Sequence, residues 1–217
     1  KAGWRCWLIP QLEGSWEELP PNLIDYAIRD RRWCQGNMQH ARLLFAPGFR
    51  PLSRLHFFMG VMSFGSSPLW LLLLLSSTIA TLQNTQLTYS FFPSQFTMFP
   101  QWPVDRSFEM LVLLVFTIGM LVVPKIISIL MVCLGRDRKK YGGVMVLASG
   151  VLETLYSALQ APIMMMLHAQ FVFSVLTGNQ VGWDAQERDD TGVPFKAALK
   201  THRTIIVIGL IWGAVAL

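Results

Sequence analysis

Charged residues are scarce in this sequence. Lys, Arg, Asp and Glu make up 14% of the 217 residues, whereas 53% are hydrophobic, and soluble domains usually carry about a quarter charged residues. The charge is also uneven, because none of these four residue types occurs from Leu55 to Val104, while residues 1–56 hold 13 of them. The shortage excludes an ordinary soluble enzyme. The pattern predicts a membrane protein with a water-exposed segment at its front.

Cysteines and local catalytic motifs are equally sparse. Cys6, Cys34 and Cys133 have no metal-ligand spacing such as C-x-x-C, which argues against a disulfide framework and fits reducing surroundings. The sequence contains no P-loop, G-x-S-x-G, H-E-x-x-H or G-x-G-x-x-G motif. Its net charge of +5 is spread over short loops rather than gathered in one patch, so nucleic acid is not expected among the partners.

Four apolar stretches are candidates for crossing a membrane. A span needs roughly 20 apolar residues to cross about 30 Å of hydrocarbon. We predict spans over residues 57–82 and 108–134, a broken helical segment over 144–178, and a truncated span from 204. A single helix over 144–178 would be about 52 Å long. Because Pro162 offers a break, a helical hairpin, or an interfacial helix with a re-entrant segment, is favoured over one tilted span.

Basic residues set the expected orientation. A short loop after the second span carries Arg136, Arg138, Lys139 and Lys140. The positive-inside rule places such a loop in the cytosol, together with residues 1–56 and the loop 179–203, and it places residues 83–107 outside. The chain has no initiator Met and no signal-peptide pattern, and it ends inside an apolar run. We therefore expect a fragment of a longer multi-pass protein.

A motif that suits substrate binding lies at residues 29–37, RDRRWCQGN. Asn22 can cap a helix from about Leu23, and on that helix Arg29, Arg32 and Trp33 share one face at spacings i, i+3 and i+4. An indole can stack on the apolar face of a sugar ring, while a guanidinium can pair with a phosphate leaving group. The alternative is a basic juxtamembrane helix that contacts anionic lipid.

These residues resemble a known family. Family 2 processive glycosyltransferases carry a Q-x-x-R-W motif on a helix before their spans, and residues 29–33 stand in that place, with Arg29 where the motif has glutamine. The segment LEGSWEELPPNLIDYAIRDRRWCQGN, KKYGG at 139–143 and QERDD at 186–190 are similar to the membrane glucosyltransferases of osmoregulated periplasmic glucan synthesis. The resemblance covers essentially the whole chain.

The resemblance implies a fold and an activity. The fold is an α-helical membrane protein, in which residues 57–217 form a transmembrane helix bundle and residues 1–56 are the tail of a cytosolic α/β glycosyltransferase domain. The implied protein lies in the bacterial inner membrane, transfers glucose from UDP-glucose to a growing β-1,2-glucan, and passes the glucan across. Arg32 would neutralise the UDP leaving group, and Trp33 would lie under the acceptor sugar. Arg29, at the altered first position, is the third expected binding residue.

The catalytic base and the metal are expected elsewhere. Such chemistry needs an anionic base and a metal that holds the diphosphate, and the family supplies both from aspartates upstream of the motif. We therefore expect no catalytic residue and no metal ligand in this chain, a divalent metal (Mg²⁺ or Mn²⁺) in the full-length enzyme, and no activity from the fragment alone.

Three further sets of residues are candidates for a role. Asn37 can form a hydrogen bond to a sugar hydroxyl, but it fits a structural role at the end of its helix equally well. Glu153, with Tyr156 as an aromatic neighbour, lies on a polar stripe of one helical face that suits a glucan path, although interhelical hydrogen bonds would explain the stripe too. The loop residues Trp183, Gln186 and Arg188 occupy the place of a gating loop in related cellulose synthases, or of a solvated connector.

Two other functions remain open from the residues alone. One is a transporter or channel bundle whose basic N-terminal helix only anchors it to lipid, with Glu153 and His168 as membrane-depth ionisable groups. The other is a non-catalytic scaffold that recruits other envelope proteins. The expected partners of the transferase are UDP-glucose, the glucan acceptor, membrane lipid and other glucan-synthesis proteins.

Overall fold

In the computed structural model, all regular secondary structure in the described part of the chain is helical. The described residues are 7, 9, 12, 14, 18–86, 90–92, 96, 98–100, 102, 106–135, 142–179, 182 and 192–216. Residues 4–9, whose alternating apolar positions suit a buried strand, fall almost wholly outside them. The described residues fall into two units, one made of residues 1–78 and 162–217 and the other of residues 79–161.

The first helix, α1, covers Leu23–His40 and has the expected cap. The Asn22 side-chain oxygen accepts a hydrogen bond from the Asp25 backbone N–H at 3.0 Å, and the Asn22 amide donates to the Asp25 carboxylate at 2.6 Å. An N-cap of this kind satisfies a backbone N–H that the first turn leaves without a partner. The sequence prediction of a helix from Leu23 is confirmed.

A short connection leads from α1 into the next helix. It begins with the 3₁₀ turn η1, Ala41–Leu44. The Arg54 guanidinium donates to the backbone carbonyl of Leu44, to that of Ala46 at 2.9 Å and to that of Phe49 at 3.4 Å. Since Arg54 belongs to the following helix, this side chain fixes the end of the α1 segment against the start of the first apolar helix.

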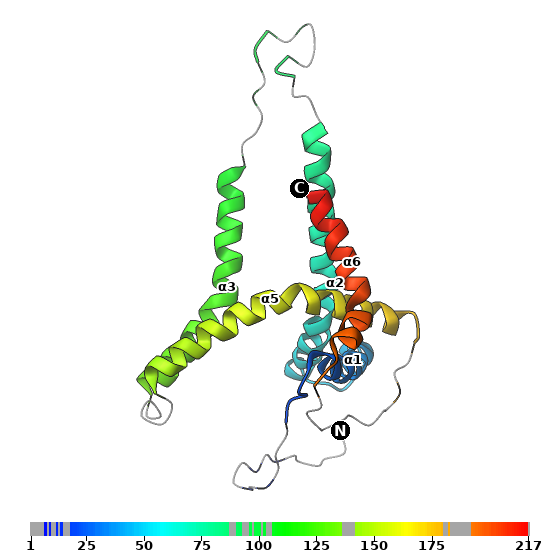
Figure 1. Ribbon diagram of the computed structural model, residues 1–217, viewed down its shortest axis with the longest axis vertical. Helices are drawn as coiled ribbons and strands as arrows, with labels where there is room; N and C mark the ends of the chain where they lie inside the picture. Colours follow the sequence, from blue (N-terminus) through cyan, green and yellow to red (C-terminus); the bar gives the residue numbers. More distant parts are fainter. Residues whose placement is uncertain are drawn as a thin grey trace. The chain divides into compact units, whose positions relative to one another are not determined.

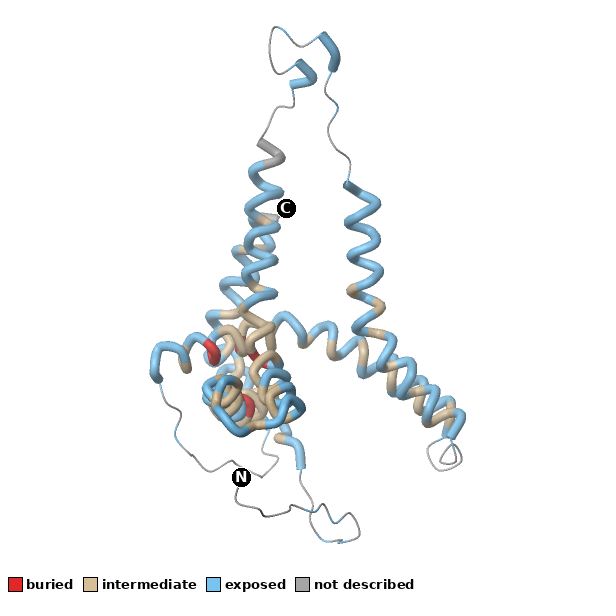
Figure 2. The backbone as a smooth tube through the Cα atoms, turned by 180° about the vertical axis from the view of Figure 1, so that it is seen from behind, coloured by how far each residue is buried: buried red, intermediate tan, exposed pale blue. Residues whose placement is uncertain are grey.

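Four long helices follow, and each is long and apolar enough to cross a membrane. They are α2 (Pro51–Gln86), α3 (Ser107–Leu134), α5 (Gly143–Leu176) and α6 (Phe195–Ala216), and Figure 1 labels them. Most of their large apolar side chains are exposed (Figure 2), as expected for surfaces that face lipid rather than a protein core. The chain is an α-helical membrane protein, which confirms the predicted fold class.

The break expected within residues 144–178 is wrong. Helix α5 continues from Gly143 to Leu176 with Pro162 inside it. A proline in a helix removes one backbone hydrogen-bond donor, whereas the turn of a hairpin would break the hydrogen bonds of at least a whole helical turn. Continuity is therefore the less costly solution, and the helical hairpin is excluded.

The expected loop over residues 179–203 is also too long. Helix α6 begins at Phe195, before the predicted start at residue 204. The Pro194 carbonyl accepts hydrogen bonds from the backbone N–H groups of Ala197 at 2.9 Å and Ala198 at 3.1 Å. Lysine and alanine are good helix formers, so a charged first turn extends the helix beyond the apolar stretch that hydropathy detects.

The small core of the first unit lies where α1 meets parts of α2, α5 and α6 (Figure 2). Its buried members are Cys34, Phe64, Leu167, Phe171 and Val172. Around them pack Ala27, Met38, Ile163, Met164 and Ile205. The polar helix α1 is thus held by its apolar side against the N-terminal half of α2 and the C-terminal half of α5.

In the second unit, the end of α3 packs antiparallel on the start of α5. The Cys133 thiol lies 3.7 Å from the Gly143 carbonyl, and Gly150 lies so close to Ile129 that an added Cβ would stand 2.5 Å from the Ile129 Cδ1. The pairs 133–143 and 129–150 step in opposite directions along the two helices. A side chain at Gly150 would therefore require the end of the Ile129 side chain to move.

Cys34 provides a test of the core. Its thiol has no solvent-accessible surface, and burial, followed by the negative charge of Asp30, raises its pKa to about 12. Because the thiolate is the reactive form, and an ordinary thiol has a pKa of about 8.5, maleimide at pH 8 should label native Cys34 roughly 10³-fold more slowly than a free thiol. Peptide mass spectrometry measures this rate. Fast labelling of the native protein would contradict the buried position, and labelling in denaturant is the control.

Candidate functional site

One face of α1 carries stacked aromatic and cationic side chains. The Arg29 guanidinium carbon lies 4.9 Å from the centroid of the Trp33 ring and 5.4 Å from that of Tyr26, which are cation–π distances. Trp33 is 52% exposed. The guanidinium beside an indole that the sequence predicts is thus supplied by Arg29, at the position where the family motif has glutamine. Arg32 lies on the same helix, one residue before Trp33, and is half-buried.

An adjoining face of α1, about 60° around the helix from Trp33, carries a buried carboxylate that sequence reasoning missed. Asp30 is 7% exposed, and its Oδ2 lies 2.5 Å from the Nε2 of His168 on α5. The Nδ1 of the same imidazole lies 3.2 Å from the Ser67 hydroxyl on α2. The available signal was a carboxylate between arginines on an otherwise basic helix, since a buried carboxylate needs a partner.

Two more polar side chains tie α1 to its neighbours. Arg31 donates to the Ser174 hydroxyl on α5 at 3.1 Å. The Asn37 amide donates to the Trp33 carbonyl at 3.0 Å, and its oxygen lies against Gly60 of α2, where there is no room for a Cβ. Asn37 therefore packs between α1 and α2, and its expected bond to a sugar hydroxyl stays a prediction.

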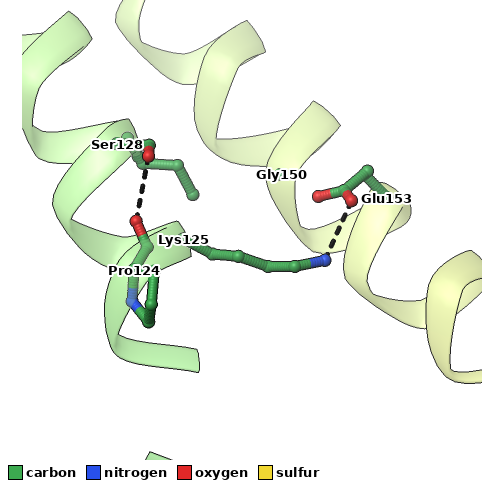
Figure 3. A pocket seen from close by; sticks show the side chains of 6 residues that line it. Pro124, Lys125, Ser128, Gly150 and Glu153 are labelled. Carbon is green, nitrogen blue, oxygen red and sulfur yellow. Dashed lines mark hydrogen bonds and ion pairs between the residues drawn. The ribbon is translucent and has the colours of Figure 1, made fainter. Parts of the chain in front are cut away.

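The predicted polar stripe on α5 forms a second site. The Lys125 ammonium on α3 donates to Glu153 Oε1 at 2.9 Å, and the Ser157 hydroxyl donates to the same oxygen at 3.2 Å. Together with Pro124, Ser128, Ile129 and Gly150, this ion pair lines an open pocket of about 280 Å³ (Figure 3). The Lys125 ammonium is thus paired with a carboxylate of the neighbouring helix. Tyr156 is exposed one turn further along α5.

The predicted gating-loop residues and the predicted metal site remain to be located. Trp183, Gln186 and Arg188 lie outside the described residues. Among those that the structure describes, no group of three or more His, Cys, Asp or Glu side chains could hold a metal ion. The described residues therefore do not form the divalent-metal site that the family resemblance implies for the full-length enzyme.

Comparisons with known proteins point to one family. The chain is 44% identical over 219 residues to the glucans biosynthesis glucosyltransferase H of Vibrio cholerae serotype O1, covering 100% of the chain and 30% of that protein. The protein of the same name from a Shewanella species is 41% identical with the same coverage. The one from Rhodopseudomonas palustris is 39% identical over 211 residues, or 96% of the chain and 29% of that protein. No family model and no solved structure matches.

These relatives agree with one another in name, and each match extends over nearly all of the chain. The chain spans about 30% of the length of the curated relatives it matches, as expected of a portion of a longer protein. The chain is therefore homologous along its length to part of glucans biosynthesis glucosyltransferase H, which confirms the resemblance that its sequence predicts.

Proposed function

We propose that this chain is the acceptor-side and membrane-embedded part of a processive glucosyltransferase of the bacterial inner membrane. The full-length enzyme would transfer glucose from UDP-glucose to a growing β-1,2-glucan and pass the product across the membrane. A divalent metal and the catalytic base would come from residues outside this chain. The names of the relatives support the reaction class.

The exposed Arg29–Trp33 stack carries this proposal. A guanidinium stacked on one side of the indole restricts the ring's rotation and leaves part of its surface open, as a sugar platform requires. Trp33 is half-exposed, whereas Asp30 and Cys34 on the adjoining face of α1 are buried. Arg32 would then pair with the departing diphosphate. An anchoring helix would favour basic side chains directed at lipid, without need for an ordered indole.

The packing of α2 and α6 supports an orientation for the bundle. Near the start of α6, Ile205 packs against the core cluster to which Phe64 of α2 belongs. Further along, the Trp212 indole donates to the Thr78 hydroxyl at 3.0 Å. Both helices therefore run in the same direction away from α1 (Figure 1). If each crosses outward from the cytosol, the chain between them must cross back an odd number of times.

On this count, we propose that α5 lies at the membrane surface. Helix α3 supplies one return crossing, so α5 adds none. Its C-terminal half packs against the arginine-rich α1, which favours a place beside α1 at the cytosolic surface. The segment after α5, which carries Trp183, Gln186 and Arg188, then lies in the cytosol on the side of α1, as a gating role requires.

The pocket at Glu153 would form the entry to a glucan path. A carboxylate and an ammonium side by side, flanked by the Ser128 and Ser157 hydroxyls, offer both acceptors and donors to a neutral polyhydroxyl chain. The charges neutralise each other, which lowers the cost of holding them next to apolar helices. Tyr156 would add an aromatic surface nearby.

The transferase proposal is tested in the full-length enzyme in membranes. Arg32→Ala and Trp33→Ala should each lower glucosyl transfer from UDP-glucose at least about tenfold, or about 1.4 kcal/mol, because the diphosphate and the acceptor lose their contacts. Radiolabelled glucan measures the rate. Membrane insertion should stay normal, and Trp70→Ala on the exposed face of α2 is the matched control. Normal activity of both variants, or defective insertion, would favour the anchor function instead.

The orientation predicts which side of the membrane labels a cysteine introduced at Arg188. A membrane-impermeant maleimide should modify this cysteine in inverted vesicles and not in spheroplasts, because α5 does not cross the membrane and residue 188 stays on the cytosolic side. A cysteine at Thr97 should give the opposite result. Modification of the Arg188 cysteine from the outside would mean that α5 crosses the membrane.

Glu153→Gln tests the glucan path. The amide keeps the shape but loses the ion pair with Lys125, so polymer output should fall severalfold while release of UDP continues. Glu109→Gln, in the first turn of α3, is the control. Equal loss of polymer and of UDP release would count against a role in the path.

A further inference from the structure

Asp30, His168 and Ser67 form a hydrogen-bonded line that joins α1, α5 and α2. We propose that His168 is a positioning residue for glucosyl transfer: by holding Asp30 it fixes the rotation of α1 about its axis, and so aims Arg29, Arg32 and Trp33 at the substrates. The inference rests on the proposed function, which it deepens.

Asp30, at one end of this line, is buried, and His168 and Ser67 are half-buried. The His168 ring packs edge-on against the Phe64 ring, with the two centroids 5.0 Å apart. The centroid of the Phe171 ring, three residues further along α5, lies 6.3 Å from that of His168. A carboxylate in such apolar surroundings is costly unless it is paired and hydrogen-bonded. Because Asp30 is 7% exposed, its carboxylate depends on His168 rather than on water for a hydrogen-bond partner.

The atoms also have defined roles. An ionised carboxylate only accepts hydrogen bonds, so the His168 Nε2 must be the donor to Asp30. In a neutral imidazole the Nδ1 is then the acceptor, and the Ser67 hydroxyl donates to it. One ring nitrogen thus holds α1, and the other fixes the imidazole against α2.

Because α1 is a rigid helix, the Asp30–His168 contact determines the direction of the face that carries Arg29 and Trp33. At 3.6 residues per turn, successive side chains are about 100° apart. Asp30 and Cys34 therefore lie within about 40° of each other on the buried face, while Trp33 and Arg29 lie about 60° and 100° away from Asp30 in the other direction. Arg31, beyond Cys34, is bonded to Ser174 of α5. Helix α5 thus holds the back of α1 at two neighbouring residues, and the stacked face points away from it.

Two substitutions separate the two ring nitrogens of His168. Glutamine can place its amide nitrogen near the Nε2 position and still donate to Asp30, whereas asparagine reaches only the Nδ1 position next to Ser67. In the full-length enzyme, His168→Asn should lower kcat at least about tenfold, and His168→Gln should stay within about threefold of the original enzyme. Cys34 labelling reports α1 docking independently of activity, and should rise in the Asn variant only.

Both variants are uncharged, polar and similar in size, so general misfolding would affect them alike. His56→Ala, at an exposed histidine of α2, is the control for loss of an imidazole. The proposal is overturned if the Asn and Gln variants behave alike. It is also overturned if the Asn variant loses activity while Cys34 stays protected, because His168 would then act by another route.

The same experiment distinguishes this inference from the proposed function. If Trp33→Ala abolishes transfer but the two His168 variants behave alike, only the positioning role fails. If Trp33→Ala stays active, the proposed function fails, and the Cys34 labelling still decides whether His168 docks α1.

Discussion

The arrangement of this chain depends on one buried carboxylate. Helix α1 is polar and bears three arginines within its middle turns, yet it must lie against apolar helices. Asp30 is the side chain that points into that apolar corner, and His168 satisfies it at 2.5 Å. Leaving a buried charged group without its hydrogen-bond partner typically costs about 1–3 kcal/mol or more. The contact therefore fixes where α1 docks and which of its faces remains open, and it joins the water-exposed helix to α5 across 138 positions of sequence.

Features determined by neighbouring residues were predictable from the sequence. The Asn22 cap and the start of α1 follow from side-chain chemistry within one turn. The apolar stretches became helices because a backbone in lipid must satisfy its own hydrogen bonds. The pairing of Arg29 or Arg32 with Trp33 follows from helical spacing alone, although only the structure identifies Arg29 as the residue over the indole.

Features that depend on distant residues were not predictable. Nothing around Asp30 indicates that His168 would be its partner, and nothing around Lys125 indicates Glu153. The sequence does not reveal that α5 continues through Pro162. Proline weakens a helix locally, but the hydrogen bonds that a hairpin turn would break are not visible in the local sequence. The start of α6 at Phe195 is not predictable from hydropathy, because hydropathy detects apolar residues rather than the ends of helices.

In the proposed function, helix α1 links glucosyl transfer to the membrane. Helix α5 holds Asp30 and Arg31 of α1, and the Trp33 indole would remain open to the acceptor. The most direct measurement is a structure of the full-length enzyme with UDP and a nascent glucan bound. The account predicts the terminal sugar against the Trp33 ring, the diphosphate near Arg32, and Asp30 still bonded to His168. A Trp33 ring turned into lipid, with the glucan bound elsewhere, would contradict it.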